Sequence, residues 1–218
     1  MELELDHFFI LVEPGGKVAD ALVSLGMQED FSRVHEGQGT TNRRFPFGNR
    51  MLEIIWVHDA EEAQNGPGRD LRFVGRANNP DASPFGVILR RKNNTCLDMP
   101  FDGWKYQPAY FKPPWAFHVG ANADKVYEPL CIYVPFIEPK TEEQSATGNE
   151  NNHVFQSITH IAIYLPSMPA SGVLNAVDAA DGLSIHYGEE HFMEVTFDGK
   201  RQACSEDFRP DIPLRLCW

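Results

Sequence analysis

The sequence has few cysteines, a shortage of basic charge and no long apolar run. Its four cysteines are widely spaced over 218 residues without a C-x-x-C pair, which disfavours a disulfide framework and a cysteine zinc site. With 31 acidic against 19 basic residues, the net charge of -12 would repel nucleic acid and anionic membranes. No apolar run reaches the ~20 residues that span a bilayer, and the acidic N-terminus predicts no signal peptide. We therefore expect a cytoplasmic globular protein with no nucleic-acid or membrane role.

The first part of the chain predicts one strand, one helix and three further strands. A dense apolar run is ended by Pro14-Gly15-Gly16, apolar side chains then recur at helical spacing, and Gly48-Asn49 marks a turn between two strand-like stretches. The expected elements are residues 5–12, 17–25, 27–36, 40–47 and 50–57. Residues 1–58 are therefore predicted to form a βαβββ module.

The end of the chain predicts the same order of elements. A strand closed by Pro166 is followed by a stretch of helix composition and then by short strands about an Asp198-Gly199 turn. The expected elements are residues 157–165, 168–180, 183–188, 191–197, 200–204 and 210–218. Asp6-His7 and Thr159-His160 occupy matching positions near the two module starts, which indicates a duplication with residues 157–218 as the second module.

The residues between the two modules differ in composition from both. Residues 59–138 are predicted to be an inserted segment that packs on the modules, with strands at 84–91 and 129–136 and an aromatic, proline-rich stretch at 99–116. Residues 139–156 are polar and nearly free of apolar side chains, so we interpret them as a linker.

Several short motifs resemble the vicinal-oxygen-chelate superfamily, and within it the glyoxalase-like proteins. Leu5-Asp6-His7-Phe8 is similar to the first strand of that family, and residues 35–42 (HEGQGTTN) are similar to its H-x-G-x-G-T-x-N turn. Residues 51–55 resemble its fourth strand, and residues 158–161 resemble the opening of its second module. The resemblance covers residues 1–57 and, more distantly, 157–218. It implies an α+β fold in which two βαβββ modules form cupped mixed sheets, here with an inserted β-rich segment between them.

The resemblance also implies candidate metal ligands in the cup. Carried over, the ligand positions are His7, Glu53, His160 and Arg215, of which the first three can bind a metal. Two imidazoles and one carboxylate suit Fe, Mn, Ni or Zn and leave open positions for a substrate. Arg215 cannot bind a metal. It would instead pair with Glu53 in a metal-free pocket or hold a carboxylate or phosphate of a ligand. Glu194 is a reserve carboxylate.

Other residues are candidates for the pocket wall. His35, Thr40 and Asn42 would line the rim, although the glycines between them equally predict simple turn chemistry. Trp115, in the aromatic stretch, would help to cover an apolar or ring-bearing ligand, or would belong to the core.

Three hypotheses of function follow. The first is a metal-dependent lyase, isomerase or dioxygenase that acts on a small oxygenated metabolite, with Glu53 as the catalytic residue. The second is a metal-free protein that binds or sequesters a small molecule, like the resistance members of the superfamily. The third is an interaction domain with a closed, filled cup. The sequence is equally compatible with a divalent metal and with no cofactor. The resemblance to the superfamily also suggests a homodimer.

Overall fold

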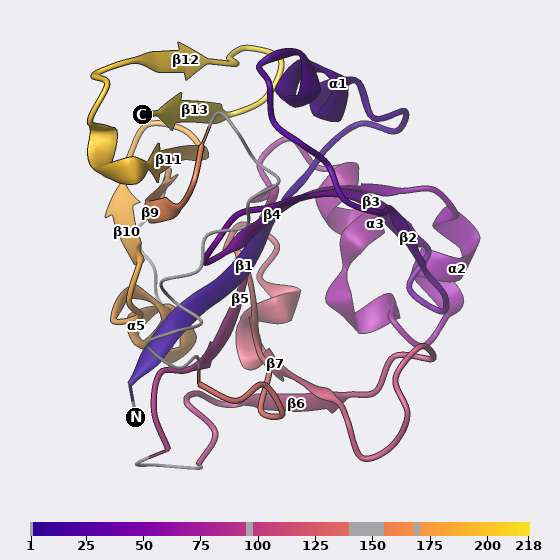
Figure 1. Ribbon diagram of the computed structural model, residues 1–218. Helices are drawn as coiled ribbons and strands as arrows, with labels where there is room; N and C mark the ends of the chain where they lie inside the picture. Colours follow the sequence, from indigo (N-terminus) through magenta and orange to yellow (C-terminus); the bar gives the residue numbers. More distant parts are fainter. Residues whose placement is uncertain (1, 95–97, 140–154, 168–170) are drawn as a thin grey trace.

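The computed structural model describes residues 2–94, 98–139, 155–167 and 171–218, and these residues form two β-sheets and several short helices (Figure 1). The first sheet contains eight strands and the second contains five. The helices are short and lie outside the sheets, so the fold is a mixed α+β architecture dominated by strands.

Residues 3–57 fold into the predicted βαβββ module. Its elements are β1 Leu3–Leu11, α1 Lys17–Ser24, β2 Arg33–His35, β3 Thr40–Pro46 and β4 Met51–Val57. β1 pairs with β4 in parallel, and β3 and β2 follow as antiparallel neighbours. A parallel pair needs a crossover connection, which α1 and the following strands provide. The strand expected over residues 27–36 is shortened to the three residues of β2.

Residues 85–133 complete the same sheet. Their strands are β5 Phe85–Arg91, β6 Gly103–Tyr106, β7 Phe117–Gly120 and β8 Leu130–Tyr133. β5 lies antiparallel beside β1 and pairs with β8 in parallel, so the sheet runs β2-β3-β4-β1-β5-β8-β7-β6. The second half repeats the strand order of the first, although the described residues between β5 and β6 form no helix. The segment expected to be an insert is thus the other half of the sheet.

Two connections carry short helical turns. The connection from β4 to β5 contains α2 Ala60–Asn65, η1 Arg69–Leu71 and α3 Phe73–Ala77. The connection from β7 to β8 contains η2 Ala121–Asp124. Figure 1 shows α2 and α3 on the side of β1, β4 and β5 that is opposite to the five-stranded sheet.

The five-stranded sheet is built from the last part of the chain. Its elements are β9 Ile158–Leu165, α5 Gly172–Asp178, β10 Leu183–Tyr187, β11 Phe192–Phe197, η3 Asp198–Lys200, β12 Ser205–Asp207 and β13 Leu214–Cys217. The strand order is β10-β9-β11-β13-β12. β9 pairs in parallel with β10, the next strand along the chain, whereas β1 pairs in parallel with β4, so this sheet is connected differently from the first module.

The main core lies between the two sheets. Alternate residues of β1, such as Phe8 and Ile10, are fully buried against Ile161, Val195 and Leu216 of the five-stranded sheet. A second apolar cluster covers the opposite face of the eight-stranded sheet, where Phe9 and Ile88 lie. The period-two alternation of strands sends neighbouring residues to these two faces. One face of the large sheet is therefore closed by the small sheet, and the other is available for a site.

The predicted fold class is confirmed as an α+β fold with two curled mixed sheets. The predicted linker, residues 139–156, lies almost wholly outside the described residues, and so do the first three residues of the helix predicted at 168–180. None of the described helices is long and apolar enough to cross a membrane.

Candidate functional site

The concave face of the eight-stranded sheet encloses a cavity of about 180 Å³, which we call the cup. Its lining comes from strands of both halves of the sheet and from the connections beside them. The two halves contribute different chemistry. The first half provides the charged and imidazole side chains, a polar wall made of His7, Arg33, His35, Asn42, Arg44 and Glu53, beside the apolar Phe9, Met51 and Ile55. Among the described residues, the second half provides no charged side chain but an apolar wall made of Ile88, Phe111, Phe117, Ile132, Val134 and Phe136, beside Tyr106 and Tyr110.

Strand register brings these side chains onto one face. Arg44 of β3 lies opposite Glu53 of β4, while His7 of β1 lies opposite Ile88 of β5, which in turn lies opposite Ile132 of β8. Directly opposite residues share a face of the sheet. The polar and the apolar walls therefore meet along the β1–β5 seam in the middle of the sheet.

His7 is held by its neighbour Asp6. The register of β1 against β5 shifts between Leu5 and His7, and such an irregularity re-aims the side chains beside it. The Asp6 carboxylate lies 2.7 Å from His7 Nδ1. Burial acts to lower the pKa of His7, but the hydrogen bond to Asp6 and the negative charges of Glu53 and Asp6 raise it above 6.5.

His35 is a neutral member of the polar wall. Its Nδ1 atom lies 2.9 Å from the hydroxyl of Thr40, which also accepts a hydrogen bond of 2.8 Å from Gln38 Nε2. Burial lowers the pKa of His35 to about 4. Thr40 is fully buried, and its hydroxyl fixes the positions of the His35 and Gln38 side chains.

The loop between His35 and Thr40 is anchored by Glu62 of α2. The Glu62 carboxylate accepts hydrogen bonds of 2.8 and 2.9 Å from the backbone N–H groups of Gly37 and Gly39. Both glycines have positive φ, at 79° and 68°, which glycine tolerates at little cost. The turn interpretation of these glycines is confirmed, and the same turn places His35 in the cup.

Gly86 makes room for the aromatic floor of the cup. A Cβ atom at this position would lie 2.0 Å from Cε1 of Phe9. We expect Gly86→Ala to push the Phe9 ring into the cup, to cost about 1–3 kcal/mol of stability, and to weaken ligand binding. Urea unfolding measures the stability change. Gly75→Ala is the control, because the nearest atom to its Cβ is 4.0 Å away. Equal stability of both variants would contradict this account of Phe9.

The structure brings together four of the predicted site residues. His7, His35, Asn42 and Glu53 all line the cup. Trp115 lies at its edge, where its ring stacks on Phe136 with the centroids 5.5 Å apart and the side chain more than half exposed.

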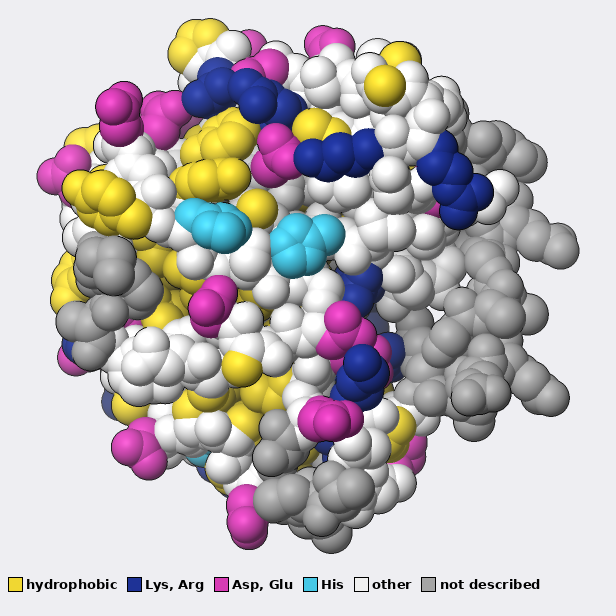
Figure 2. Space-filling view, turned by 90° about the vertical axis from the view of Figure 1, so that its left-hand side faces the viewer, with side chains coloured by type: hydrophobic (Ala, Val, Ile, Leu, Met, Phe, Trp, Pro, Cys, Tyr) yellow, Lys and Arg dark blue, Asp and Glu magenta, His cyan; other side chains and the backbone are white. Residues whose placement is uncertain are grey.

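His160 is not brought to His7. It belongs to β9 of the five-stranded sheet, and its Nε2 atom lies 2.8 Å from the Ser184 hydroxyl, which lies 2.8 Å from Nε2 of His186. The neighbouring Ile161 faces the core, so alternation sends His160 to the outer face. Figure 2 shows the molecule from this side, with histidine, charged and apolar side chains on one surface.

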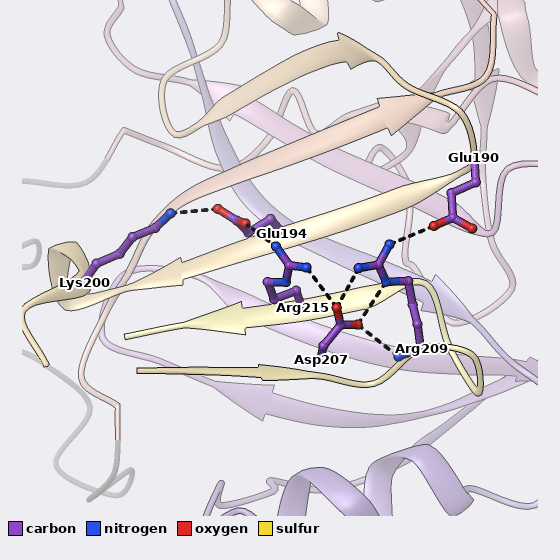
Figure 3. A network of polar contacts seen from close by, with 6 residues as sticks. All are labelled: Glu190, Glu194, Lys200, Asp207, Arg209 and Arg215. Carbon is purple, nitrogen blue, oxygen red and sulfur yellow. Dashed lines mark hydrogen bonds and ion pairs between the residues drawn. The ribbon is translucent and has the colours of Figure 1, made fainter. Parts of the chain in front are cut away.

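Arg215 does not pair with Glu53. It lies on β13, where its Nη2 atom is 2.9 Å from Asp207 and its Nη1 atom is 3.7 Å from Glu194. Figure 3 shows these contacts within a larger network on the five-stranded sheet, which continues to Glu190, Lys200 and Arg209. The predicted Glu53–Arg215 pair is therefore wrong, because the two residues belong to different sheets.

The described residues do not offer a suitable ligand set for a divalent metal in the cup. Opposite His7, the second half of the sheet presents Ile88 and Ile132, neither of which can bind a metal. Arg44, across from Glu53, adds a positive charge that opposes a cation. In the described part of the chain no three or more His, Cys, Asp or Glu residues group so as to hold a metal ion.

Sequence reasoning missed Arg33 and Arg44 and, apart from the aromatic stretch, the apolar wall. Arg44 follows Asn42 by two positions on the same strand, so the alternation of β3 could have placed it in the cup. The apolar wall required the knowledge that residues 85–133 complete the sheet. The apolar run at residues 84–91 indicates this arrangement, because the first strand of the second half of the sheet would have to lie there.

Comparison with known proteins agrees with the fold. No family model and no curated protein matches the chain. A hypothetical protein from Staphylococcus aureus is similar over 98% of both chains, with a TM-score of 0.54 and 13% identity. Methylmalonyl-CoA epimerase from Mycobacterium tuberculosis aligns with 66% of this chain and 92% of its own, with a TM-score of 0.37 and 15% identity. The full-length similarity shows that this chain shares its overall fold with the Staphylococcus aureus protein.

Proposed function

We propose that the protein binds a small molecule in the cup without a metal ion, and that the ligand has an aromatic or comparably apolar body and a polar end. The observation that carries this proposal is the division of the lining into a polar wall from the first half of the sheet and an apolar wall from the second. Ligand sites commonly combine apolar walls with a few polar groups that fix the orientation of the ligand.

The size of the cup limits the ligand. An apolar cavity of about 150 Å³ is enough to hold benzene, and the cup offers about 180 Å³. Aromatic side chains of the apolar wall contact one another, with ring centroids 5.0 Å apart for Phe111 and Phe117 and 5.3 Å apart for Phe111 and Phe136. Such rings favour another ring as a contact partner. A molecule with one aromatic ring and a short polar group is the expected size.

The metal-dependent hypothesis receives less support than the metal-free one. Of its three predicted ligands, His160 lies on a different sheet from His7 and Glu53, and the second half of the sheet presents isoleucines beside His7. The chemistry proposed for Glu53 therefore does not depend on a cation. Its carboxylate is available to accept a hydrogen bond or a proton from a bound molecule.

Filling the cup tests the proposal. We expect Ile88→Trp to weaken the binding of 4-fluorobenzoate and 4-fluorobenzamide by at least about tenfold, a loss of about 1.4 kcal/mol, because the indole would occupy the cavity. The measurement is broadening of the ligand ¹⁹F signal during titration. Val23→Trp, at an exposed position of α1, is the control and should bind like the wild type.

A second variant distinguishes loss of the cavity from loss of the fold. Ile132→Phe fills the same space with a smaller change in volume, and its thermal midpoint shows whether the fold persists. Undiminished binding by folded Ile88→Trp and Ile132→Phe proteins would overturn the proposed site, as would an absence of binding by the wild type.

A further inference from the structure

We infer that the polar end of the ligand in the cup is a carboxylate, so that the ligand class is a small aromatic acid. This inference rests on the proposed function, because it concerns the molecule that the cup binds. It depends on two features of the lining of the cup: buried hydrogen-bond donors without acceptors, and positive charge without a matching number of acids.

Three buried donors that line the cup have no partner. They are Asn42 Nδ2, Arg44 Nε and the Tyr106 hydroxyl. Asn42 and Tyr106 are almost completely buried, with 1% and 3% of their surfaces exposed. The orientation of the Asn42 amide is set, because its Oδ1 atom accepts a 2.9 Å hydrogen bond from the Arg33 backbone N–H. Nδ2 must therefore be a donor, and buried donors in native proteins normally have acceptors.

The charges of the lining also favour an anionic group on the ligand. Two guanidinium groups, those of Arg33 and Arg44, line the cup, whereas Glu53 is its only carboxylate among the described residues. Arg44 is paired outside the cup with Asp30 at 2.9 Å, while Arg33 makes no ion pair within the described part of the chain and lies 5.4 Å from the Tyr110 ring. The guanidinium groups of the lining therefore outnumber its carboxylates, in a protein whose net charge is -12.

A carboxylate satisfies both features. It accepts hydrogen bonds at both oxygens and donates none, and arginine can bind it through two parallel N–H groups. An ammonium group would face the positive charges of Arg33 and Arg44 and would leave the Asn42 Nδ2 donor without an acceptor. An amide would satisfy the donors with one oxygen but would leave the charge of Arg33 without a counterion. Glu53 itself opposes an anion, so its removal should improve the binding of an acid.

Three probes of the same size test the inference. We expect wild-type protein to bind 4-fluorobenzoate at least about tenfold more tightly than 4-fluorobenzamide, as a charged hydrogen bond permits, and to bind 4-fluorobenzylamine most weakly. Arg33→Gln should reduce the affinity for the benzoate and leave that for the benzamide unchanged. Glu53→Gln should increase the affinity for the benzoate.

The matched control is Arg43→Gln. Arg43 is the neighbour of Arg44 on β3, but its guanidinium faces away from the cup and pairs with Asp20 and Glu29. Its replacement should leave the preference for the benzoate intact. Equal or tighter binding of the benzamide by the wild type, or an equal loss of both probes in Arg33→Gln, would overturn the inference while the proposed binding role stands. Absence of binding by all three probes would overturn both.

Discussion

Replacement of Gly39 by alanine is expected to lower the free energy of unfolding by a large part of its total. Gly39 has a φ of 68°, and a Cβ atom there would lie 2.3 Å from the Asp59 carbonyl oxygen and 2.4 Å from the Ala63 backbone nitrogen. Backbone atoms cannot move aside as a side chain can. The left-handed conformation costs about 1–2 kcal/mol and forced overpacking about 1–3 kcal/mol more. We therefore expect a loss of about 3 kcal/mol or more in urea unfolding.

Gly199 is a matched control for this experiment. Its φ of 69° is nearly that of Gly39, but no atom lies within 4 Å of its Cβ position. Gly199→Ala should show only the conformational cost of about 1–2 kcal/mol. Similar losses in the two variants would mean that close approach of the Gly39 loop to α2 does not contribute. The loop also carries His35 and Gln38, so a folded Gly39→Ala protein should bind ring probes more weakly.

Arg76→Met is expected to have an effect of similar size by a different cause. The buried Arg76 guanidinium of α3 donates hydrogen bonds to backbone carbonyls, at 2.7 Å to Glu128, 3.0 Å to Val126 and 3.3 Å to both Ser83 and Ala123. Burial lowers the pKa of Arg76 to about 10, so it stays charged at neutral pH. Each buried acceptor left without a donor costs about 1–3 kcal/mol, and a total loss of about 3 kcal/mol or more should appear in urea unfolding.

The control for Arg76 is Arg69→Met. Arg69 lies nearby in η1 with an exposed side chain whose closest acid, Asp70, is 4.0 Å away. Its replacement should change stability by less than about 1 kcal/mol. If Arg76→Met were as mild as Arg69→Met, the carbonyls of the 121–128 connection would have to be satisfied in another way. Because this connection leads into β8, the prediction also concerns the apolar wall of the cup.

Local sequence patterns were sufficient for the elements but not for their assembly. The apolar run of β1, the helical spacing of α1 and the glycine turn before β3 depend on neighbouring residues, and each was predicted close to its place. The pairing of β1 with β5 depends on contacts between distant strands. Thr159-His160 resembles the start of a module, so the sequence predicts the second half of the cup at residues 157–218. In the structure, β9 belongs to the five-stranded sheet and packs against the core face of β1.

The candidate site was predictable to the extent that it belongs to the first module. His7, His35, Asn42 and Glu53 follow from the alternation of three strands and one turn. His160 and Arg215 were assigned through the supposed duplication and lie on the outer face of the five-stranded sheet instead. With Arg215 on the other sheet, the countercharge that we propose for the ligand comes from Arg33, which lies in none of the recognised motifs.

The most direct measurement of the central claim is the affinity of the wild-type protein for 4-fluorobenzoate before and after removal of divalent metals with EDTA. Purification should use no added chelator, and the same titration should be repeated after addition of Mn²⁺, Ni²⁺ or Zn²⁺. A cup that binds without a metal should give the same dissociation constant in all samples. Loss of binding after EDTA treatment with recovery on addition of one metal would contradict the account and restore a metal to His7 and Glu53.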